Sequence, residues 1–313
     1  MIELGDSMAT VIKRKIKVKK KNLTIFLVFI MLLCFSLYEL GFVIYKAITT
    51  SKEEETIQEE EIKPIKKTTE YEEKLQKLDN IDQKITYFKR DNIDRYLAYK
   101  EKNKDLSVTQ VVKNVNMNLD LIPYQDITRA LNLNTSLVLV NKYYYLDEDY
   151  VPDNLERIST RYALSGMKLV KPAKEAFENM AKAASKEDLS IIAMSTYRSY
   201  NYQVSLYNRY KREDGMEKAD SYSGRPGHSE HQTGYAVDVY NGEDNYTNFE
   251  ETDEFDWMQE HAHEYGFILR FPKDKENETG YIYESWHYRY VGTKTASYIK
   301  KQNISLEEYI ATQ

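Results

Sequence analysis

Cysteine is almost absent from this sequence. Cys34 is the only cysteine among 313 residues, and it lies inside an apolar run near the N-terminus. The rest of the chain can therefore form no disulfide bond and offers no thiolate to a metal ion. Any metal site there must be built from His, Asp and Glu side chains.

Net positive charge is also absent beyond the first 50 residues. Residues 1–50 carry eight Lys and Arg against three Asp and Glu, a balance of +5, which leaves −11 for the remainder of a net charge of −6. Binding to the phosphates of nucleic acids depends on clustered Lys and Arg. The composition therefore predicts no nucleic-acid partner.

The N-terminal segment has the pattern of an uncleaved membrane anchor. Lys and Arg crowd residues 13–21, and residues 23–45 then contain a single charge, Glu39, over a length that spans a bilayer. This bias predicts that residues 1–22 are cytoplasmic and that the chain beyond about Lys46 is exported. A cleavable signal peptide, the main alternative, would have a shorter apolar region and an A-x-A-type site, which is not evident. We expect a single-pass protein of the cell membrane.

Two further segments precede the region of highest interest. Residues 46–70 are dense in charge and poor in large apolar side chains, which is typical of a linker. Residues 71–135 show a helical pattern of apolar side chains as far as about residue 104, and Ser107 is a candidate N-cap for a helix through Val115. We interpret residues 71–135 as a helical stalk that raises the following domain from the membrane.

Residues 136–313 are predicted to form a catalytic-type domain of the α+β class. The sequence predicts strands at 137–140, 189–195, 235–240, 267–271 and 283–291, and helices at 172–184, 200–210 and 253–265. Gly266 follows the last helix, where a left-handed cap is common. Helices and strands do not alternate in a regular β-α-β rhythm, which favours α+β over a parallel α/β fold.

The stretch S-E-H-Q-T-G-Y-A-V-D at residues 229–238 brings candidate metal ligands together. On the predicted strand, Asp238 shares one face with Ala236, and the flanking valines point to the opposite face. His231 lies in the preceding loop, and His287 in E-S-W-H-Y-R-Y is a third candidate. Two His and one carboxylate, with a fourth position left for water, form a catalytic zinc set.

Glu284 lies three residues before His287 and is the candidate general base for such a site. Residues 284 and 287 would face opposite sides of a regular strand, so a turn or bulge must separate them, or Glu284 must precede the strand. His261 and His263 would lie roughly 200° apart on their helix and cannot share a metal; we interpret them as surface or helix-end residues. His228 either lines the cleft or hydrogen-bonds within its loop.

Three motifs in order resemble the VanY-like D-alanyl-D-alanine carboxypeptidases, namely S-E-H-Q-T-G-Y-A-V-D, W-M-Q-E-H-A-H-E-Y-G-F-I-L-R-F-P and E-S-W-H-Y-R-Y. The resemblance covers roughly residues 136–300. It implies a small antiparallel sheet with flanking helices around a zinc cleft, a fold shared with the hedgehog signalling domain. It also implies Zn²⁺ bound by His231, Asp238 and His287, with Glu284 as the base.

The upstream segment Y-R-S-Y-N-Y-Q resembles the family's Y-R-S-x-x-x-Q and implies that Arg198 and Gln203 lie on the substrate side. A guanidinium can hold a free C-terminal carboxylate with two charge-assisted hydrogen bonds. Ser229 either contacts the substrate or only fixes the loop around His231. Four further residues are candidates for the cleft or, alternatively, for structural positions: Tyr197, Arg270, Trp286 and Tyr288.

The activity that the resemblance implies is removal of the C-terminal D-Ala from peptidoglycan stem peptides. Cleavage of pentapeptides would make the protein a D,D-carboxypeptidase, and cleavage of tetrapeptides an L,D-carboxypeptidase. A non-catalytic, zinc-stabilised module that binds the cell wall is the alternative from another class. The presence of Glu284 and Arg198 favours an enzyme.

Overall fold

The computed structural model describes residues 69–243 and 246–313, and Thr69–Gln313 form one compact unit. The predicted cytoplasmic tail, membrane anchor and almost all of the charged linker lie outside the described residues. Within the part that is described, no helix is both long and apolar enough to cross a bilayer.

The predicted stalk begins with three short helices, α2 (Thr69–Lys77), α3 (Ile93–Lys102) and α4 (Val108–Asn116). The expectation of one helical pattern over 71–104 is wrong between α2 and α3, because Asp79 and Asn80 adopt left-handed φ angles of 54° and 50°. Only short 3-10 turns form there, at Ile81–Gln83 and Arg90–Asn92. The side chains of the apolar stripe still pack together, in a small core shared by all three helices.

Ser107 caps α4, as its position predicted. Its side chain accepts from the backbone of Gln110, and the Gln110 side chain accepts in return from the backbone of Ser107. This reciprocal pair satisfies two backbone donors at the helix start that have no partner within the helix.

The centre of the remaining chain is a four-stranded antiparallel sheet in the order β5-β6-β8-β7. Its strands are β5 (Ile192–Ser195), β6 (Ala236–Tyr240), β7 (Phe267–Leu269) and β8 (His287–Tyr290). Each lies within or close to a predicted strand, which confirms the α+β class and the small antiparallel sheet. β8 begins only at His287, so Glu284 precedes the strand. This was one of the two arrangements expected to bring Glu284 and His287 to the same side.

The predicted strand at 137–140 does not form. Val138 and Val140 are buried, as the apolar run suggested, but this segment pairs with no strand among the described residues. The carbonyl oxygens of Ser136 and Val138 instead accept hydrogen bonds from the Arg289 guanidinium, at 3.0 and 2.7 Å. A side chain distant in the sequence therefore replaces the backbone partner that a strand would need.

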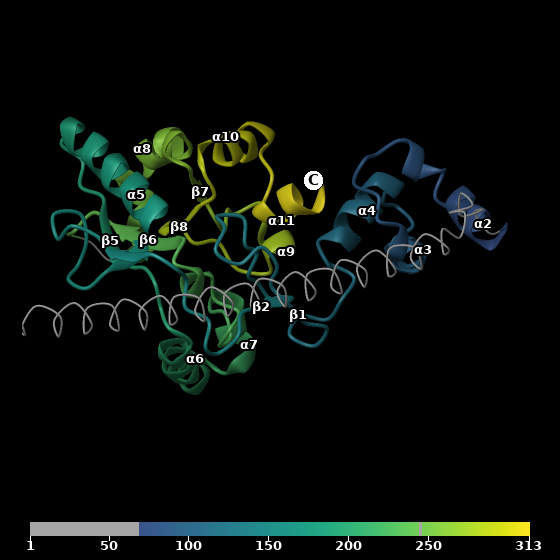
Figure 1. Ribbon diagram of the computed structural model, residues 1–313, viewed down its shortest axis with the longest axis horizontal. Coiled ribbons are helices and arrows are strands. Elements are labelled where there is room, and N and C mark those ends of the chain that lie inside the picture. The colour runs from purple at the N-terminus through teal and green to yellow at the C-terminus, as the bar shows by residue number, and fades with distance from the viewer. Residues whose placement is uncertain (1–68, 244–245) are drawn as a thin grey trace, which may run out of the picture. The chain divides into compact units, whose positions relative to one another are not determined.

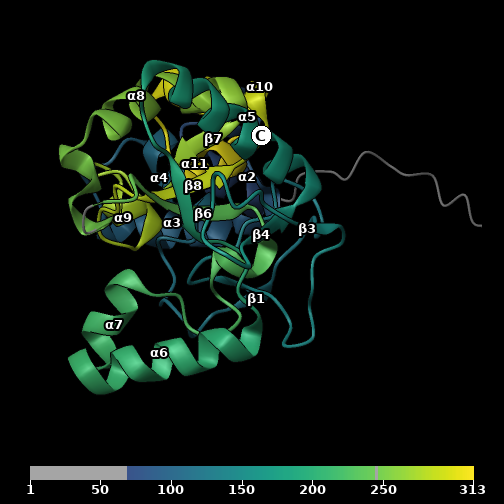
Figure 2. The same ribbon diagram turned by 90° about the vertical axis from the view of Figure 1, so that its left-hand side faces the viewer.

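Helices cover both faces of the sheet (Figure 1, Figure 2). On one side lie α5 (Lys171–Ala184), α8 (Asp253–His261) and α10 (Thr293–Gln302), and on the other lie α6 (Tyr200–Asp214) and α7 (Met216–Tyr222). Val237 and Val239 are buried in the same core as Phe177 of α5 and Met258 of α8. The alternation of β6 therefore leaves Asp238 on the side of α6 and α7.

The other elements are short. They comprise the paired strands β1 (Thr128–Arg129) and β2 (Tyr144–Tyr145), the paired strands β3 (Leu155–Arg157) and β4 (Lys168–Val170), the 3-10 turns at Ser185–Glu187, Glu230–Thr233, Tyr246–Glu251 and Ala262–Tyr265, and the helices α9 (Glu276–Thr279) and α11 (Leu306–Ala311). The C-terminal α11 contacts α4 through an ion pair between Glu308 and Lys113. Asn116 of α4 also donates to the carbonyl oxygen of Ala311.

Candidate active site

The site is built around Asp238 in the middle of β6. Ser195 of β5 and His287 of β8 are its direct partners on the two neighbouring strands. Directly paired residues carry their side chains on the same face of a sheet. A register shift between Ala193 and Ser195 brings Ser195 opposite Asp238, in the way that a β-bulge re-aims a side chain.

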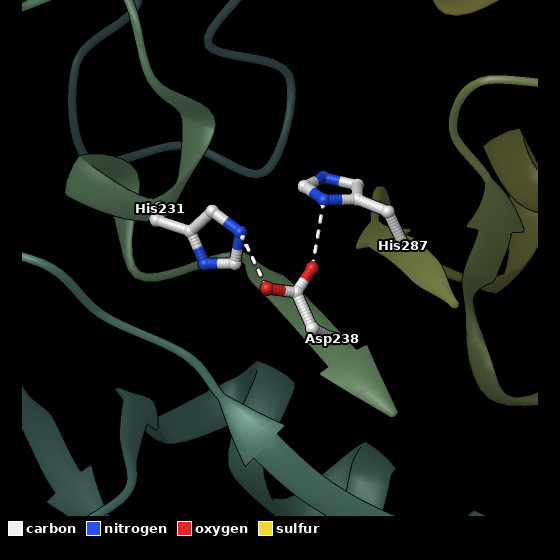
Figure 3. Close-up of side chains that lie close together, drawn as sticks. All are labelled: His231, Asp238 and His287. Atoms are coloured by element: carbon white, nitrogen blue, oxygen red, sulfur yellow. Dashed lines mark ion pairs between the residues drawn. The ribbon is translucent and has the colours of Figure 1, made fainter. Parts of the chain in front are cut away.

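Three side chains converge on one point beside this strand (Figure 3). Nε2 of His231 lies 3.2 Å from Oδ2 of Asp238, and Nδ1 of His287 lies 2.9 Å from Oδ1. One ligand atom from each residue lies within 4.8 Å of the other two, and all three residues are buried. Nδ1 of His231 donates to the carbonyl oxygen of Thr196 at 2.7 Å, which directs Nε2 towards Asp238.

These residues fit a zinc ion. Oδ1 of Asp238 is buried and forms no hydrogen bond within the described structure, although the His287 ring lies beside it. Burial, aided by Arg198, lowers the pKa of His231 to about 4, whereas Asp238 and Glu230 outweigh burial and raise the pKa of His287 to about 9, so a zinc ion would bind the neutral ring of His231 and displace a proton from His287. Burial alone would raise the pKa of Asp238, but the Arg198 guanidinium, 2.6 Å away, helps to hold it well below its usual value. Two imidazole nitrogens and one carboxylate oxygen are the donors of catalytic zinc.

Glu284 lies beside this ligand set, in the segment just before β8. Its Oε2 is 3.6 Å from Nδ1 of His287, and its side chain is almost fully buried. Burial raises the pKa of Glu284 to about 8, and the Asp238 carboxylate contributes to the increase. A divalent cation at the three ligands would lower this pKa, because an opposite charge nearby favours the ionised form. Glu284 is therefore placed to act as a proton acceptor beside the ligand set.

Arg198 reaches the same point from the loop after β5. Its Nη2 donates to Oδ2 of Asp238 at 2.6 Å and to Oγ of Ser195 at 2.7 Å, and its Nε also donates to Ser195. The side chain is only partly buried and lines the cleft. The predicted substrate-side arginine therefore lies directly next to the metal ligands.

Gln203, Ser229 and His228 all line the cleft. Gln203 is buried on α6, and its Nε2 donates to the carbonyl oxygen of Gly224 at 2.7 Å, so it also holds the loop before the ligand motif. His228 lines the cleft, as the first of its two interpretations proposed, but its Nδ1 donates to the carbonyl oxygen of the distant Asn141 and not within its own loop. A Cβ at Gly224 would lie 2.5 Å from the carbonyl oxygen of His228, which is why the loop needs glycine there.

Aromatic side chains form the walls of this cleft of about 320 Å³. Tyr210 of α6 packs edge to face on Tyr222 of α7 with ring centroids 5.2 Å apart. Tyr246 packs in the same way on Trp286 at 5.1 Å. Of the predicted wall residues, Trp286 is confirmed, whereas Tyr197 and Tyr288 do not line the cleft. These three tyrosines and Tyr281, which also lines the cleft, were missed because, among 28 tyrosines, nothing local distinguishes them.

Arg270 takes the structural one of its two predicted roles. It is fully buried, does not line the cleft, and pairs with Glu230 and Glu307. Arg270 and Arg289 outweigh burial and lower the pKa of Glu230, a cleft residue that the sequence analysis missed. Its position between Ser229 and His231 in the motif was the available signal. His261 and His263 lie away from the cleft, as predicted.

The comparisons with known proteins agree with this geometry. Residues 166–293 match the VanY family, described as D-alanyl-D-alanine carboxypeptidase. The putative carboxypeptidase YodJ of Bacillus subtilis is 40% identical over 186 residues, which are 55% of this chain and 66% of YodJ. VanXYC of Enterococcus gallinarum, a bifunctional D-Ala-D-Ala dipeptidase and D-Ala-D-Ala carboxypeptidase, is 32% identical over 56% of this chain and 93% of that protein.

Among solved structures, one is of the LdcB LD-carboxypeptidase and was described in connection with peptidoglycan recognition. The sequence of that protein is 37% identical to this chain. The structural match covers 60% of this chain and 91% of the LdcB chain, with a TM-score of 0.56. The likeness therefore extends to the three-dimensional fold. The chain spans just under two thirds of the length of YodJ, so the match concerns one part of that relative.

Proposed function

Because the chain belongs to the VanY family of D-alanyl-D-alanine carboxypeptidases, we propose that it is a zinc-dependent carboxypeptidase that trims peptidoglycan stem peptides. One observation supports this proposal above the others. Two imidazoles and a carboxylate converge on one point, and the buried carboxyl group of Glu284 lies 3.6 Å from one of these ligands. A site that only bound zinc for stability would not need a buried carboxyl group of raised pKa beside it.

The reaction divides between the metal and the protein side chains. Zinc held by His231, Asp238 and His287 supplies Lewis acidity, which activates water and stabilises developing negative charge. Glu284 accepts a proton from the attacking water and delivers it to the leaving amine. Burial of all four side chains keeps competing water away and strengthens their electrostatic interactions.

Arg198 selects the end of the peptide. The hydrogen bonds that the structure shows for it use Nε and Nη2, which leaves Nη1 for a substrate. A guanidinium in the cleft binds a free carboxylate strongly and directionally. Cleavage therefore occurs next to the free C-terminus, which makes the enzyme an exopeptidase.

The favoured substrate is the pentapeptide stem that ends in D-Ala-D-Ala, in agreement with the description of the family. An L,D-carboxypeptidase acting on tetrapeptides is the second candidate, since the LdcB LD-carboxypeptidase is 37% identical and has the same fold. The cleft that would make this choice is walled by Tyr210, Tyr222, Tyr246 and Trp286.

Residues 23–45 anchor the enzyme in the cell membrane in this proposal. The basic run before them keeps the N-terminus inside and directs the catalytic part towards the cell wall. Fractionation of cells, followed by protease treatment of intact protoplasts, tests this placement. The proposal expects the chain in the membrane fraction, with the catalytic part open to protease from outside.

The activity is tested with the purified protein and synthetic stem peptides, pentapeptide and tetrapeptide, each with and without a zinc chelator. Mass spectrometry identifies the products. Chelator-sensitive loss of one D-Ala from the pentapeptide supports the D,D assignment, and loss from the tetrapeptide alone moves it to L,D. Zinc binding without release from either peptide would instead favour a wall-binding module.

A further inference from the structure

We propose that Glu230 and Glu307 are positioning residues that hold the zinc ligand His287 in its binding orientation. Glu307 lies on the C-terminal helix α11, outside residues 166–293 that match the family. The inference rests on the zinc site of the proposed function and adds a segment to it that the family comparison does not include.

Glu230 lies beside the ring of His287. Oε2 of Glu230 lies 3.8 Å from Nε2 of His287. Both atoms are buried, and neither has a hydrogen-bond partner in residues 69–243 and 246–313. In the metal-free chain the Asp238 carboxylate draws a proton to Nδ1, but with a metal ion at Nδ1 the carboxylate of Glu230 would favour the tautomer with hydrogen on Nε2. That tautomer leaves the lone pair of Nδ1 free, and Nδ1 is the atom that lies beside Asp238 and Glu284.

Two arginines hold the carboxylate of Glu230. Its Oε1 accepts from Nε of Arg270 at 2.8 Å and lies 2.8 Å from Nη1 of Arg289. Both guanidinium groups are fully buried, so the surrounding atoms prevent them from moving with a displaced carboxylate. Glu230 can therefore turn Oε2 only towards His287.

Arg270 connects Glu230 to Glu307 of α11. Nη1 and Nη2 of Arg270 donate to the two carboxylate oxygens of Glu307, at 2.8 and 2.6 Å. This two-pronged pairing fixes the plane of the guanidinium and hence the position of its Nε, which holds Glu230. Asn141 donates to Glu307 from a third direction at 3.2 Å. Two buried arginines and two buried glutamates together balance in charge, which a buried ionic group requires.

The neighbouring residue on α11 provides a matched control. Glu308 pairs with Lys113 of α4, whereas the guanidinium of Arg270 donates to Glu230 and Glu307. Replacing either glutamate by glutamine removes one charge from the same helix. Only the replacement at 307 interrupts the connection to His287.

The experiment uses the full chain and its variants Glu230→Gln, Glu307→Gln and Glu308→Gln, each prepared free of metal. Zinc affinity is measured by competition with a chromophoric chelator. We expect Glu230→Gln to weaken zinc binding about 10- to 100-fold, the range found when an outer partner of a metal ligand is removed. Glu307→Gln should weaken it by less, because it acts through Arg270. Glu308→Gln should bind zinc as the unmodified chain does.

A second measurement separates positioning from stability. The rise in Tm on addition of a fixed zinc concentration is recorded for each variant relative to its own metal-free form. That rise depends on zinc affinity, whereas a loss of packing lowers both Tm values together. A smaller rise in Glu230→Gln and Glu307→Gln, and an unchanged rise in Glu308→Gln, is the expected result.

Unchanged zinc affinity and an unchanged rise in Tm for Glu230→Gln and Glu307→Gln would overturn the inference and leave the charge cluster a structural one. If Glu230→Gln does not fold, the comparison of Glu307→Gln with Glu308→Gln decides. The proposed function fails separately, when the unmodified chain binds zinc but cleaves no peptide. An unmodified chain that binds no zinc would overturn both.

Discussion

Nδ1 of His287 lies 2.9 Å from Oδ1 of Asp238, and the two residues are direct partners on β8 and β6. Two of the three candidate metal ligands thus stand on adjacent antiparallel strands, whose backbone pairing sets their separation. His231 comes from the 3-10 turn that precedes β6, and Glu284 comes from the loop that leads into β8. The metal centre is therefore held mainly by the sheet, and the surrounding loops supply the cleft.

Removal of the proposed base should separate catalysis from metal binding. Glu284→Gln keeps the size of the side chain but cannot accept a proton, so kcat should fall about 10²- to 10⁴-fold. Zinc content should stay near one ion per chain, because the three ligands are intact. Activity on stem peptides and metal analysis of the same sample measure both. Glu260→Gln, at an exposed glutamate, is the control; full activity in Glu284→Gln would exclude the base role.

Arg198→Lys should impair recognition of the free C-terminus. Lysine keeps the charge but loses the planar fork, and a hydrogen bond to a charged group contributes about 1.5–3 kcal/mol. We therefore expect kcat/KM for the stem peptide to fall roughly 10- to 150-fold. A peptide with a C-terminal amide serves as the control, since the unmodified enzyme should already cleave it poorly. If Arg198→Lys cleaves the acid as fast as the unmodified chain does, another group binds the carboxylate.

The aromatic walls should affect binding of the substrate more than the chemistry. Tyr222→Ala removes one ring from the wall of the cleft, and the loss of one aromatic contact to a bound peptide should cost about 0.5–1.5 kcal/mol. KM for stem peptides should rise about 2- to 10-fold, with kcat nearly unchanged. Tyr222→Phe keeps the ring and removes only the hydroxyl group, which donates to Asp214. It should resemble the unmodified enzyme, and an equal loss in both variants would assign the effect to the hydroxyl group.

His228 should make the stability of the metal-free protein depend on pH. Burial lowers the pKa of His228 below its usual value of 6.5, against the opposing hydrogen bond to Asn141. The unfolded chain therefore binds a proton more readily than the folded one. The free energy of unfolding should decrease as pH falls below about 6.5, by at most about 1.4 kcal/mol per pH unit.

Urea unfolding of the metal-free protein between pH 8 and pH 5 measures this dependence. His228→Gln keeps a donor for Asn141 but cannot titrate, so its free energy of unfolding should change less over the range. All other titrating groups are common to both proteins and cancel in the difference. Parallel curves for the two proteins would contradict the prediction.

Much of the sheet and of the metal centre could be predicted from local pattern. Alternation along residues 235–240 placed Asp238 opposite the core-facing valines, and the structure confirms that division of faces. Short apolar runs were less reliable. Residues 137–140 have the composition of a buried strand, yet the carbonyl oxygens of Val138 and of the preceding Ser136 bond to the Arg289 side chain. Composition reports burial, but it does not report the hydrogen-bond partner.

The sequence by itself determined which side chains could hold the metal, because donor types, spacing and strand alternation are local properties. The tertiary structure alone decided what surrounds them. Tyr210, Tyr222 and Tyr246 wall the cleft only because α6, α7 and residues 246–251 fold against the sheet. The series of contacts from Glu307 through Arg270 and Glu230 to His287 likewise joins residues far apart in sequence. Such contacts depend on how distant segments pack, and no local pattern encodes them.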